Sequence, residues 1–347
     1  MAEAGANTPK KGPSPLVEMA MGFFRSRALC AAARLAIADA IGAGEKFVDQ
    51  LARECGADPS ALYRLLRALA SFGIVRETEH RHFAMTPLGA TLRKDAPDSD
   101  WPAVVFWGDL LADCWSQLTD CVRSGQSAWA IAGREGITLK LAKDPETADI
   151  FQAVMGTAPA EDYMPLARAW DFSRCRVVSD LGGGGGALIR AVLKGNPNVR
   201  GILVDRQGVE AAAARFVSEG LESRCVMIAA DLKKTVPTGA DVHLLKNVLH
   251  AYGDDDAITI LKNCRSSLPP DGRLLIIEFV MPDVCLAPDR DLEFRAMSDL
   301  NMLAVTGGKE RSALEFQELL DRAGFQVNTI IDVSGDPASI IDASPNQ

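Results

Sequence analysis

The stretch Val177-Val-Ser-Asp-Leu-Gly182-Gly-Gly-Gly-Gly186 decides the fold of this chain of 347 residues. Its apolar, β-branched start predicts a short strand, which carries Asp180 and runs into five consecutive glycines. Residues 187–193 then have the apolar spacing of a helix. A strand, a glycine turn and a helix in this order form the nucleotide-binding corner of a doubly wound α/β sheet.

The glycine turn has three interpretations. Glycines can simply pack a helix tightly on a strand, and Gly182, Gly184 and Ala187 also fit the dinucleotide pattern G-x-G-x-x-A. Asp180 disfavours a dinucleotide, because a carboxylate at this turn would repel a pyrophosphate. A carboxylate suits a ligand with its own positive charge, such as S-adenosylmethionine with its ammonium and sulfonium groups. We therefore expect Asp180, Gly182, Gly183 and Gly184 to bind this nucleoside cofactor.

Composition restricts the class of protein. Apolar residues make up 48% of the chain and charged residues 24%, with a net charge of -9. This charge disfavours nucleic acid or an anionic membrane as partner. The eight cysteines form no C-x-x-C pair, which favours free thiols in a reducing compartment over disulfides or a metal site. No signal peptide is recognisable, and charges interrupt the apolar run 28–41, so we expect a cytoplasmic protein without a membrane span.

Residues 16–100 have the pattern of a winged helix. A short helix over 48–56 ends at a glycine, and Asp58-Pro59 begins a second helix. Residues 74–78 and 82–86 flank a charged tip and predict a β-hairpin. A winged helix that reads DNA would carry a basic face. Residues 1–100 contain 13 Lys/Arg and 12 Asp/Glu, so 13 − 12 gives only +1. This balance favours a subunit-contact domain, and hence a homodimer, over a DNA-binding regulator.

The rest of the chain divides at its change of pattern. Residues 1–15, rich in Pro, Gly and Lys, predict a disordered tail, and residues 101–172 predict a helical connector lining an acceptor pocket. Phe151 and Met155 share one helix face there and point either into a core or into that pocket. Residues 173–347 alternate between strands and helices. The predicted strands are 176–181, 200–205, 225–230, 241–246 and 273–279, followed by 326–333 and 339–342.

A late strand pair that joins a five-stranded parallel sheet is typical of the class I methyltransferase fold. Ligands of open α/β sheets bind at the carboxyl ends of the strands. Asp205 ends the second predicted strand, where its carboxylate can accept hydrogen bonds from both ribose hydroxyls. Asp231 and Leu232 follow the third strand and can hold the adenine. His250 lies just beyond the fourth strand, and imidazole can take a proton from a phenol near neutral pH.

These residues stand in motifs that resemble the S-adenosylmethionine-dependent small-molecule O-methyltransferases. That family includes plant caffeate and flavonoid enzymes and bacterial antibiotic-tailoring and phenazine enzymes. The resemblance covers the chain from about Phe23 to the end. Its motifs here are Ala33-Arg-Leu-Ala-Ile-Ala-Asp-Ala40, Leu62-Tyr-Arg-Leu-Leu-Arg-Ala-Leu69, Met85-Thr-Pro-Leu-Gly89, Asp180-Leu-Gly-Gly-Gly184, Leu245-Lys-Asn-Val-Leu-His250, Ile276-Ile-Glu278 and Gly307-Gly-Lys-Glu-Arg311.

The resemblance implies a role for each matched residue. His250 falls on the general base, and Glu278 and Glu310 fall on the two acids that flank and orient it. The implied cofactor contacts are Gly182, Asp205, Asp231, Leu232 and Lys246. Met155 and Met302 fall on positions that pack against the acceptor ring. The winged helix of the family serves dimerisation, in agreement with the charge argument.

Three positions depart from the family pattern. Ala251 follows His250, where the family often has Asp. Gly185 replaces the usual Thr, His or Ser, and Arg206-Gln207 replace a common Leu-Pro. The expected reaction is methyl transfer from S-adenosylmethionine to a phenolic or enolic hydroxyl of an aromatic metabolite, with S-adenosylhomocysteine as product and no metal. The alternative enzymatic function is that of a repurposed methyltransferase fold, which catalyses hydroxylation or a pericyclic step instead of methyl transfer.

Overall fold

The computed structural model describes residues 12–134, 136–137, 140, 143–155, 159–206, 209–284 and 287–346, without the side chains of 209–211. The chain forms two compact units, Met1–Ala112 and Asp113–Gln347. The division therefore lies inside the predicted connector 101–172. Residues 1–11 of the predicted tail lie outside the described residues, and the first helix begins at Pro15.

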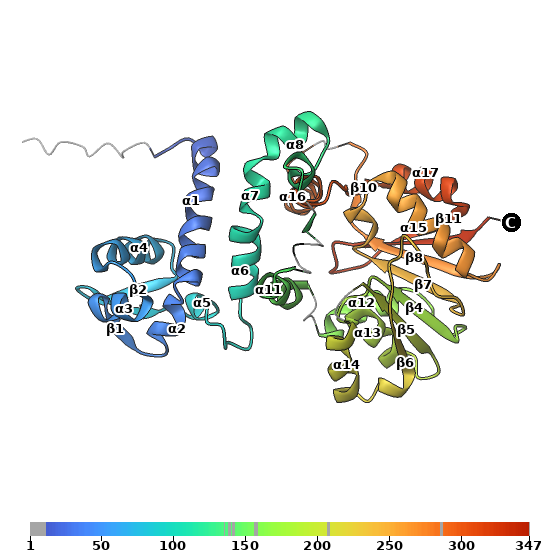
Figure 1. The fold of residues 1–347 in the computed structure, drawn as a ribbon, viewed down its shortest axis with the longest axis horizontal. Coiled ribbons are helices and arrows are strands. Elements are labelled where there is room, and N and C mark those ends of the chain that lie inside the picture. Colours follow the sequence, from blue (N-terminus) through green and yellow to red (C-terminus); the bar gives the residue numbers. More distant parts are fainter. Residues whose placement is uncertain are drawn as a thin grey trace, which may run out of the picture. The chain divides into compact units, whose positions relative to one another are not determined.

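The first unit contains the predicted helices and hairpin (Figure 1). The helices are α1 (Pro15–Arg34), α2 (Ile37–Ile41), α3 (Val48–Cys55), α4 (Pro59–Ser71), α5 (Pro87–Ala90) and α6 (Trp101–Val105), followed by the π-helix η1 (Phe106–Leu110). The strands β1 (Glu45–Phe47), β2 (Val75–Glu79) and β3 (His82–Met85) form an antiparallel sheet in the order β1-β3-β2.

Local chemistry explains these boundaries. The side chain of Asp58 accepts a hydrogen bond from the Ala61 N–H at 2.8 Å, which caps the start of α4 before its N1 proline. Gly56 closes α3 in the left-handed conformation with φ 62°. The helices and the hairpin enclose one apolar core, which includes Leu51, Leu66 and Phe83.

The second unit is built on a seven-stranded sheet in the order β11-β12-β8-β7-β4-β5-β6. Its strands are β4 (Val177–Leu181), β5 (Arg200–Asp205), β6 (Cys225–Ala229), β7 (Val242–Lys246), β8 (Arg273–Glu278), β11 (Phe325–Asp332) and β12 (Ser339–Pro345). The five strands β4 to β8 pair in parallel, and β12 pairs antiparallel with both β8 and β11. The predicted doubly wound sheet with a late antiparallel strand is confirmed.

Helices cover both faces of this sheet (Figure 1). The neighbouring residues Leu244 and Leu245 of β7 belong to different cores, because successive side chains of a strand point to opposite faces. One core includes side chains of α12 (Met164–Ala169), α13 (Ala187–Gly195) and α14 (Val209–Ser218). The other includes side chains of α15 (Asp254–Ser267) and α17 (Ala313–Ala323).

Short helices precede the sheet in this unit. They are α7 (Ala112–Ser116), α8 (Leu118–Ser124), α9 (Ala128–Ile131), α11 (Pro145–Met155) and η2 (Ala160–Tyr163). The long helix α16 (Arg290–Val305) packs against α8 and α9, and the Trp115 indole donates to Asn301 Oδ1 at 3.0 Å. The remaining elements are the 3₁₀ turns η3 (Glu222–Arg224) and η4 (Leu249–Ala251) and the short strands β9 (Val280–Met281) and β10 (Arg311–Ser312). Within the described ranges, no helix combines the length and the apolarity that crossing a bilayer requires.

Candidate active site

The glycine turn between β4 and α13 has a backbone conformation in which residues other than glycine would be strained. Gly182, Gly184 and Gly186 have φ angles of 73°, 52° and 72°. A Cβ at Gly183 would lie 2.5 Å from the Asp180 Cγ, so the turn rests directly on that carboxyl group. A Cβ at Gly184 would meet nothing within 4 Å, so this side of the turn is open.

Asp180 lies beneath the turn and is only 1% exposed. Its Oδ2 accepts a hydrogen bond from the Ile189 N–H at 3.3 Å, while its buried Oδ1 has no partner in the described part of the chain. Burial raises the pKa of Asp180 to about 7. A buried carboxyl oxygen without a partner calls for a donor or a cation, which fits the cationic amino-acid end of S-adenosylmethionine.

The carboxylates that end the next two strands have different surroundings. Asp205 Oδ2 accepts a hydrogen bond from the Gly184 N–H at 2.8 Å and ties β5 to the glycine turn. Asp231 accepts from Arg206 Nη2 at 2.7 Å, and the neighbouring Leu232 is buried. Desolvation would raise the pKa of Asp231, but the Arg206 hydrogen bond outweighs it and lowers that pKa. Arg206 is one of the departures from the family pattern, so this ion pair belongs to this chain's own version of the site.

Lys246 closes β7 at the same edge of the sheet. Its Nζ lies 5.1 Å from the centroid of the Tyr163 ring, within reach of a cation–π contact. Burial lowers the pKa of Lys246. A lysine that is partly desolvated in this way can interact strongly with an anionic group of a ligand.

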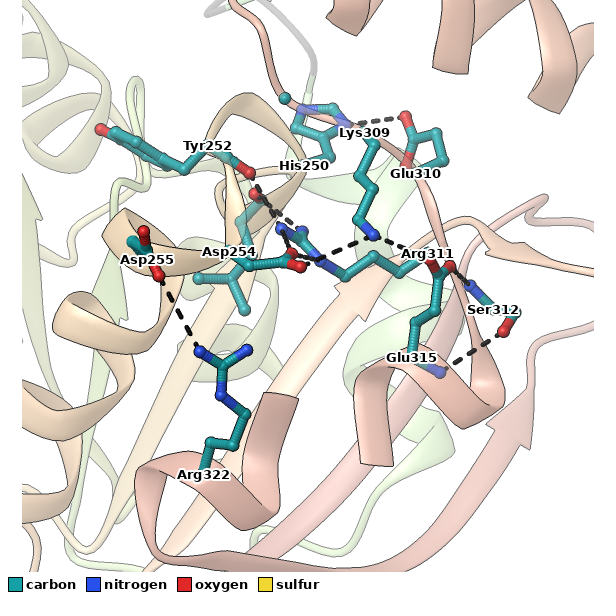
Figure 2. A network of polar contacts seen from close by, with 12 residues as sticks. His250, Tyr252, Asp254, Asp255, Lys309, Glu310, Arg311, Ser312, Glu315 and Arg322 are labelled. Atoms are coloured by element: carbon teal, nitrogen blue, oxygen red, sulfur yellow. Dashed lines mark hydrogen bonds and ion pairs between the residues drawn. The ribbon is translucent and has the colours of Figure 1, made fainter. Parts of the chain in front are cut away.

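His250 lies on the 3₁₀ turn η4 beyond the end of β7. Its Nδ1 lies 2.8 Å from Glu310 Oε1 (Figure 2). Ser298 of α16 donates a hydrogen bond to the same oxygen at 2.7 Å. Burial opposes protonation of this imidazole, which is 14% exposed, but the hydrogen bond to Glu310 and the charge of Glu278 prevail and raise the pKa of His250. No motif or spacing predicts Ser298 as a site residue, because its side chain contacts the histidine only through Glu310.

Glu278 contacts the same histidine differently. Its fully buried Oε1 accepts from the backbone N–H groups of Val248, Leu249 and His250 at 3.0, 2.6 and 3.1 Å. Glu310 therefore contacts the imidazole ring, whereas Glu278 contacts the backbone of the turn that carries it. Burial raises the pKa of Glu278. Its Oε2 and that of Glu310 are buried without partners in the described chain.

The three predicted acceptor contacts lie on two helices. Met302 is partly buried on α16, one turn after Ser298, which places it on the helix face nearest Glu310. Phe151 and Met155 lie on α11, where Met155 is 47% exposed.

A second histidine of this strand, His243, is buried in β7 between the hydroxyls of Ser179 and Ser267. Burial lowers its pKa to about 4, so it stays neutral near pH 7. The described residues contain no cluster of three or more His, Cys, Asp or Glu side chains that could hold a metal ion.

The sheet order, the glycine turn and the carboxylate-bound histidine at the strand ends define a class I methyltransferase. Comparison with family models agrees: residues 115–326 match the O-methyltransferase domain and residues 17–95 match the O-methyltransferase dimerisation domain. The chain belongs to the family of S-adenosylmethionine-dependent O-methyltransferases.

Several characterised proteins are similar along nearly the whole chain. Phenazine O-methyltransferase PhzM of Lysobacter antibioticus is 34% identical over 96% of this chain and 96% of its own length. Mitomycin biosynthesis 6-O-methyltransferase of Streptomyces lavendulae is 33% identical over 94% of this chain and 92% of its own length. The chain is also similar to the structure of NcsB1, an O-methyltransferase from neocarzinostatin biosynthesis in complex with S-adenosylmethionine and 2-hydroxy-5-methyl naphthoic acid. The TM-score is 0.82 and the sequence identity 29%, and the match covers 97% of this chain and 100% of that one. The relatives also include N-methyltransferases.

Proposed function

We propose that this protein transfers a methyl group from S-adenosylmethionine to a phenolic or enolic hydroxyl of an aromatic secondary metabolite. The observation that carries this proposal is the contact of His250 Nδ1 with the buried Glu310 carboxylate at 2.8 Å. A carboxylate at Nδ1 fixes the tautomer and leaves Nε2 as the basic nitrogen. Nε2 would take the hydroxyl proton as the acceptor oxygen becomes a nucleophile.

The residues at the strand ends would hold the cofactor. Asp180 Oδ1, which has no partner among the described residues, and the open side of the turn at Gly184 fit an amino-acid moiety. Asp205 would accept from the ribose hydroxyls in place of the Gly184 N–H, and Asp231 with Leu232 would hold the adenine. Gly182, Gly183 and Lys246 complete the proposed site. When bound, S-adenosylmethionine supplies an electrophilic methyl group.

After proton transfer, Glu310 would stabilise the imidazolium at Nδ1. Ser298 would hold the Glu310 carboxylate in place through the hydrogen bond that it donates to Oε1. Glu278 would keep the turn in place and add a second negative charge nearby. This proton transfer requires no metal ion. It also favours a hydroxyl acceptor over an amine, because an amine attacks through a lone pair that is already free, whereas a phenol gains most from losing its proton.

The acceptor would bind beside His250, with Phe151, Met155 and Met302 against its ring. Support comes from the relatives, whose names specify phenazine, naphthoate and hydroxybenzoate substrates. Flat aromatic rings pack well against methionine and phenylalanine side chains. Phenols screened with isotope-labelled S-adenosylmethionine would identify an acceptor for kinetic work.

The first unit would form a homodimer with a second copy of the chain. Residues 17–95 match the dimerisation domain of the family. Large apolar side chains, Leu16, Met19, Phe23 and Phe24, are exposed along the first half of α1 in the single chain. A row of exposed apolar side chains favours burial in a protein contact. Light scattering of the full chain should give twice the mass of one chain, and a monomer would contradict the proposal.

The pH dependence of the rate tests the role of the His250–Glu310 pair. Because His250 must be neutral to accept a proton and its pKa is raised, kcat/KM should rise with pH through a limb above the ordinary histidine range. Glu310→Gln removes the negative charge that raises this pKa, so the limb should move to lower pH while the plateau falls. The profile is measured with saturating S-adenosylmethionine and limiting acceptor. An unchanged limb in Glu310→Gln would show that the limb does not report His250.

A further inference from the structure

Two buried side chains of opposite charge hold the turn η4 that carries His250. Glu278 accepts from its N–H groups, as described above. On the carbonyl side, Arg311 donates from Nη1 to the Leu249 carbonyl at 3.1 Å and from Nη2 to the Tyr252 carbonyl at 2.9 Å (Figure 2). Arg311 is fully buried.

Asp254, at the start of α15, completes the arrangement. Its Oδ1 accepts from Arg311 Nη2 at 2.9 Å and from Nε at 3.2 Å. Desolvation works against the Asp254 carboxylate, but the Arg311 guanidinium prevails and lowers the pKa of Asp254. A buried guanidinium without such a carboxylate would be strongly destabilising. The ion pair therefore keeps the charged fork of Arg311 at the two carbonyl groups.

The segment that supplies Arg311 also supplies Glu310. These two residues are neighbours in the chain, and their side chains have different partners: Glu310 contacts the imidazole and Arg311 contacts the backbone of the turn (Figure 2). The segment lies directly against the turn, because a Cβ on Gly308 would be 2.0 Å from the His250 carbonyl oxygen. Its far end is fixed by the capping box of Ser312 and Glu315 at the start of α17.

We propose that Arg311, paired with Asp254, is a positioning residue: it fixes the backbone of the His250 turn at the distance where Glu310 reaches the imidazole. This inference rests on the proposed function only in its catalytic consequence, since the positioning itself is a property of the protein without acceptor. Among the described residues, the Arg311 side chain hydrogen-bonds to Leu249, Tyr252 and Asp254 and not to the His250 imidazole.

The variant Arg311→Lys distinguishes a positioning role of this side chain from a role of its charge alone. Lysine keeps the positive charge but lacks the planar fork that reaches two carbonyls and a carboxylate together. If Arg311 positions the turn, Arg311→Lys should weaken the His250–Glu310 contact, and the pKa of His250 should fall. If Arg311 acts only through its charge, or only as part of the core, that pKa should not change.

The pKa of His250 can be measured directly by NMR, because the chain has only four histidines. His243 has a pKa of about 4 and does not titrate near neutral pH. Of the other three imidazole signals, the one that is lost in His250→Asn is assigned to His250. The charged groups around the imidazole are Glu310, Glu278 and Lys246, and Arg311→Lys substitutes none of them. We expect the pKa of His250 to fall by about half a unit or more, as for loss of part of one charge-assisted hydrogen bond. An unchanged or raised pKa would overturn the proposal.

Arg322→Lys is the matched control. Like Arg311, Arg322 forms an ion pair with a carboxylate at the start of α15, but its pair with Asp255 at 3.8 Å is exposed and lies away from the turn (Figure 2). Its substitution should leave the pKa of His250 unchanged. S-adenosylhomocysteine binding, measured by calorimetry, confirms that each variant is folded.

Asp254→Asn is a second variant in case Arg311→Lys does not fold, since the Asp254 side chain is partly exposed. It should broaden the Nδ1–H signal of His250 that the Glu310 contact protects, and a wild-type signal would count against the proposal. A shifted pKa in Arg311→Lys together with full methyl transfer by His250→Ala would leave the positioning proposal standing and remove the proposed base. An unchanged pKa in Arg311→Lys together with loss of methyl transfer in His250→Ala would overturn the positioning proposal and support His250 as the base.

Discussion

Replacing His250 by alanine is expected to lower the rate of methyl transfer by about 10²–10⁴-fold, the usual contribution of a general base. Affinity for S-adenosylmethionine should remain close to that of the wild type, because the glycine turn, Asp180 and Asp205 belong to other strand ends. The rate is measured in a single turnover with labelled cofactor and an acceptor found by screening. The affinity is measured by calorimetry with S-adenosylhomocysteine.

His80→Ala is the matched control for this experiment. His80 is exposed near the tip of the β2–β3 hairpin in the first unit, so its loss should change neither quantity. Wild-type turnover of the true acceptor by His250→Ala would remove His250 from the mechanism. A large loss of cofactor affinity would instead give the histidine a binding role.

Gly308→Ala is expected to have an effect of similar size through geometry alone. The added Cβ would lie 2.0 Å from the His250 carbonyl oxygen and 2.7 Å from the Ala251 carbonyl carbon, so the turn or the 308–311 segment must move. A displacement of about 1 Å at a catalytic group can lower a rate by about 10²-fold. We expect a loss of turnover of about this size with S-adenosylhomocysteine binding retained.

Gly253→Ala makes the corresponding change nearby without the clash. Gly253 has φ -67°, and its added Cβ would come no closer than 3.9 Å to the Gly307 carbonyl oxygen. This variant should keep wild-type turnover. Equal activity of Gly308→Ala and Gly253→Ala would show that close contact between the 308–311 segment and the turn is not needed for catalysis.

Much of the fold follows from local sequence signals. The predicted strand 200–205 coincides with β5, and the predicted strands 225–230 and 273–279 differ from β6 and β8 by one residue at one end. The middle of each strand is an apolar run, which is typical of parallel sheets. Among the three strands, β8 is buried on both faces, whereas β6 is a partly exposed strand at the edge of the sheet. The start of α4 was equally predictable, because Asp58-Pro59 combines an N-cap with an N1 proline.

The contacts inside the site were only partly predictable. Motif matching selected His250, Glu278 and Glu310, and the structure brings all three together. Motif matching could not show that Glu278 contacts the backbone of the turn while Glu310 contacts the imidazole ring, because this depends on which atoms of the turn face each strand end. Ser298 and Arg311 were not selected as site residues, since their partners are distant in sequence and follow no period. The Arg206–Asp231 ion pair was likewise not predictable, because it depends on how the ends of two strands lie in space.

The most direct test of the central claim is the stoichiometry of a complete turnover. The full-length protein is incubated with S-adenosylmethionine and an acceptor, and both products are quantified by mass spectrometry. We predict one S-adenosylhomocysteine formed for each acceptor converted, and one methyl group added to an acceptor oxygen. Conversion of the acceptor with S-adenosylmethionine unconsumed would contradict methyl transfer and would favour a repurposed methyltransferase fold.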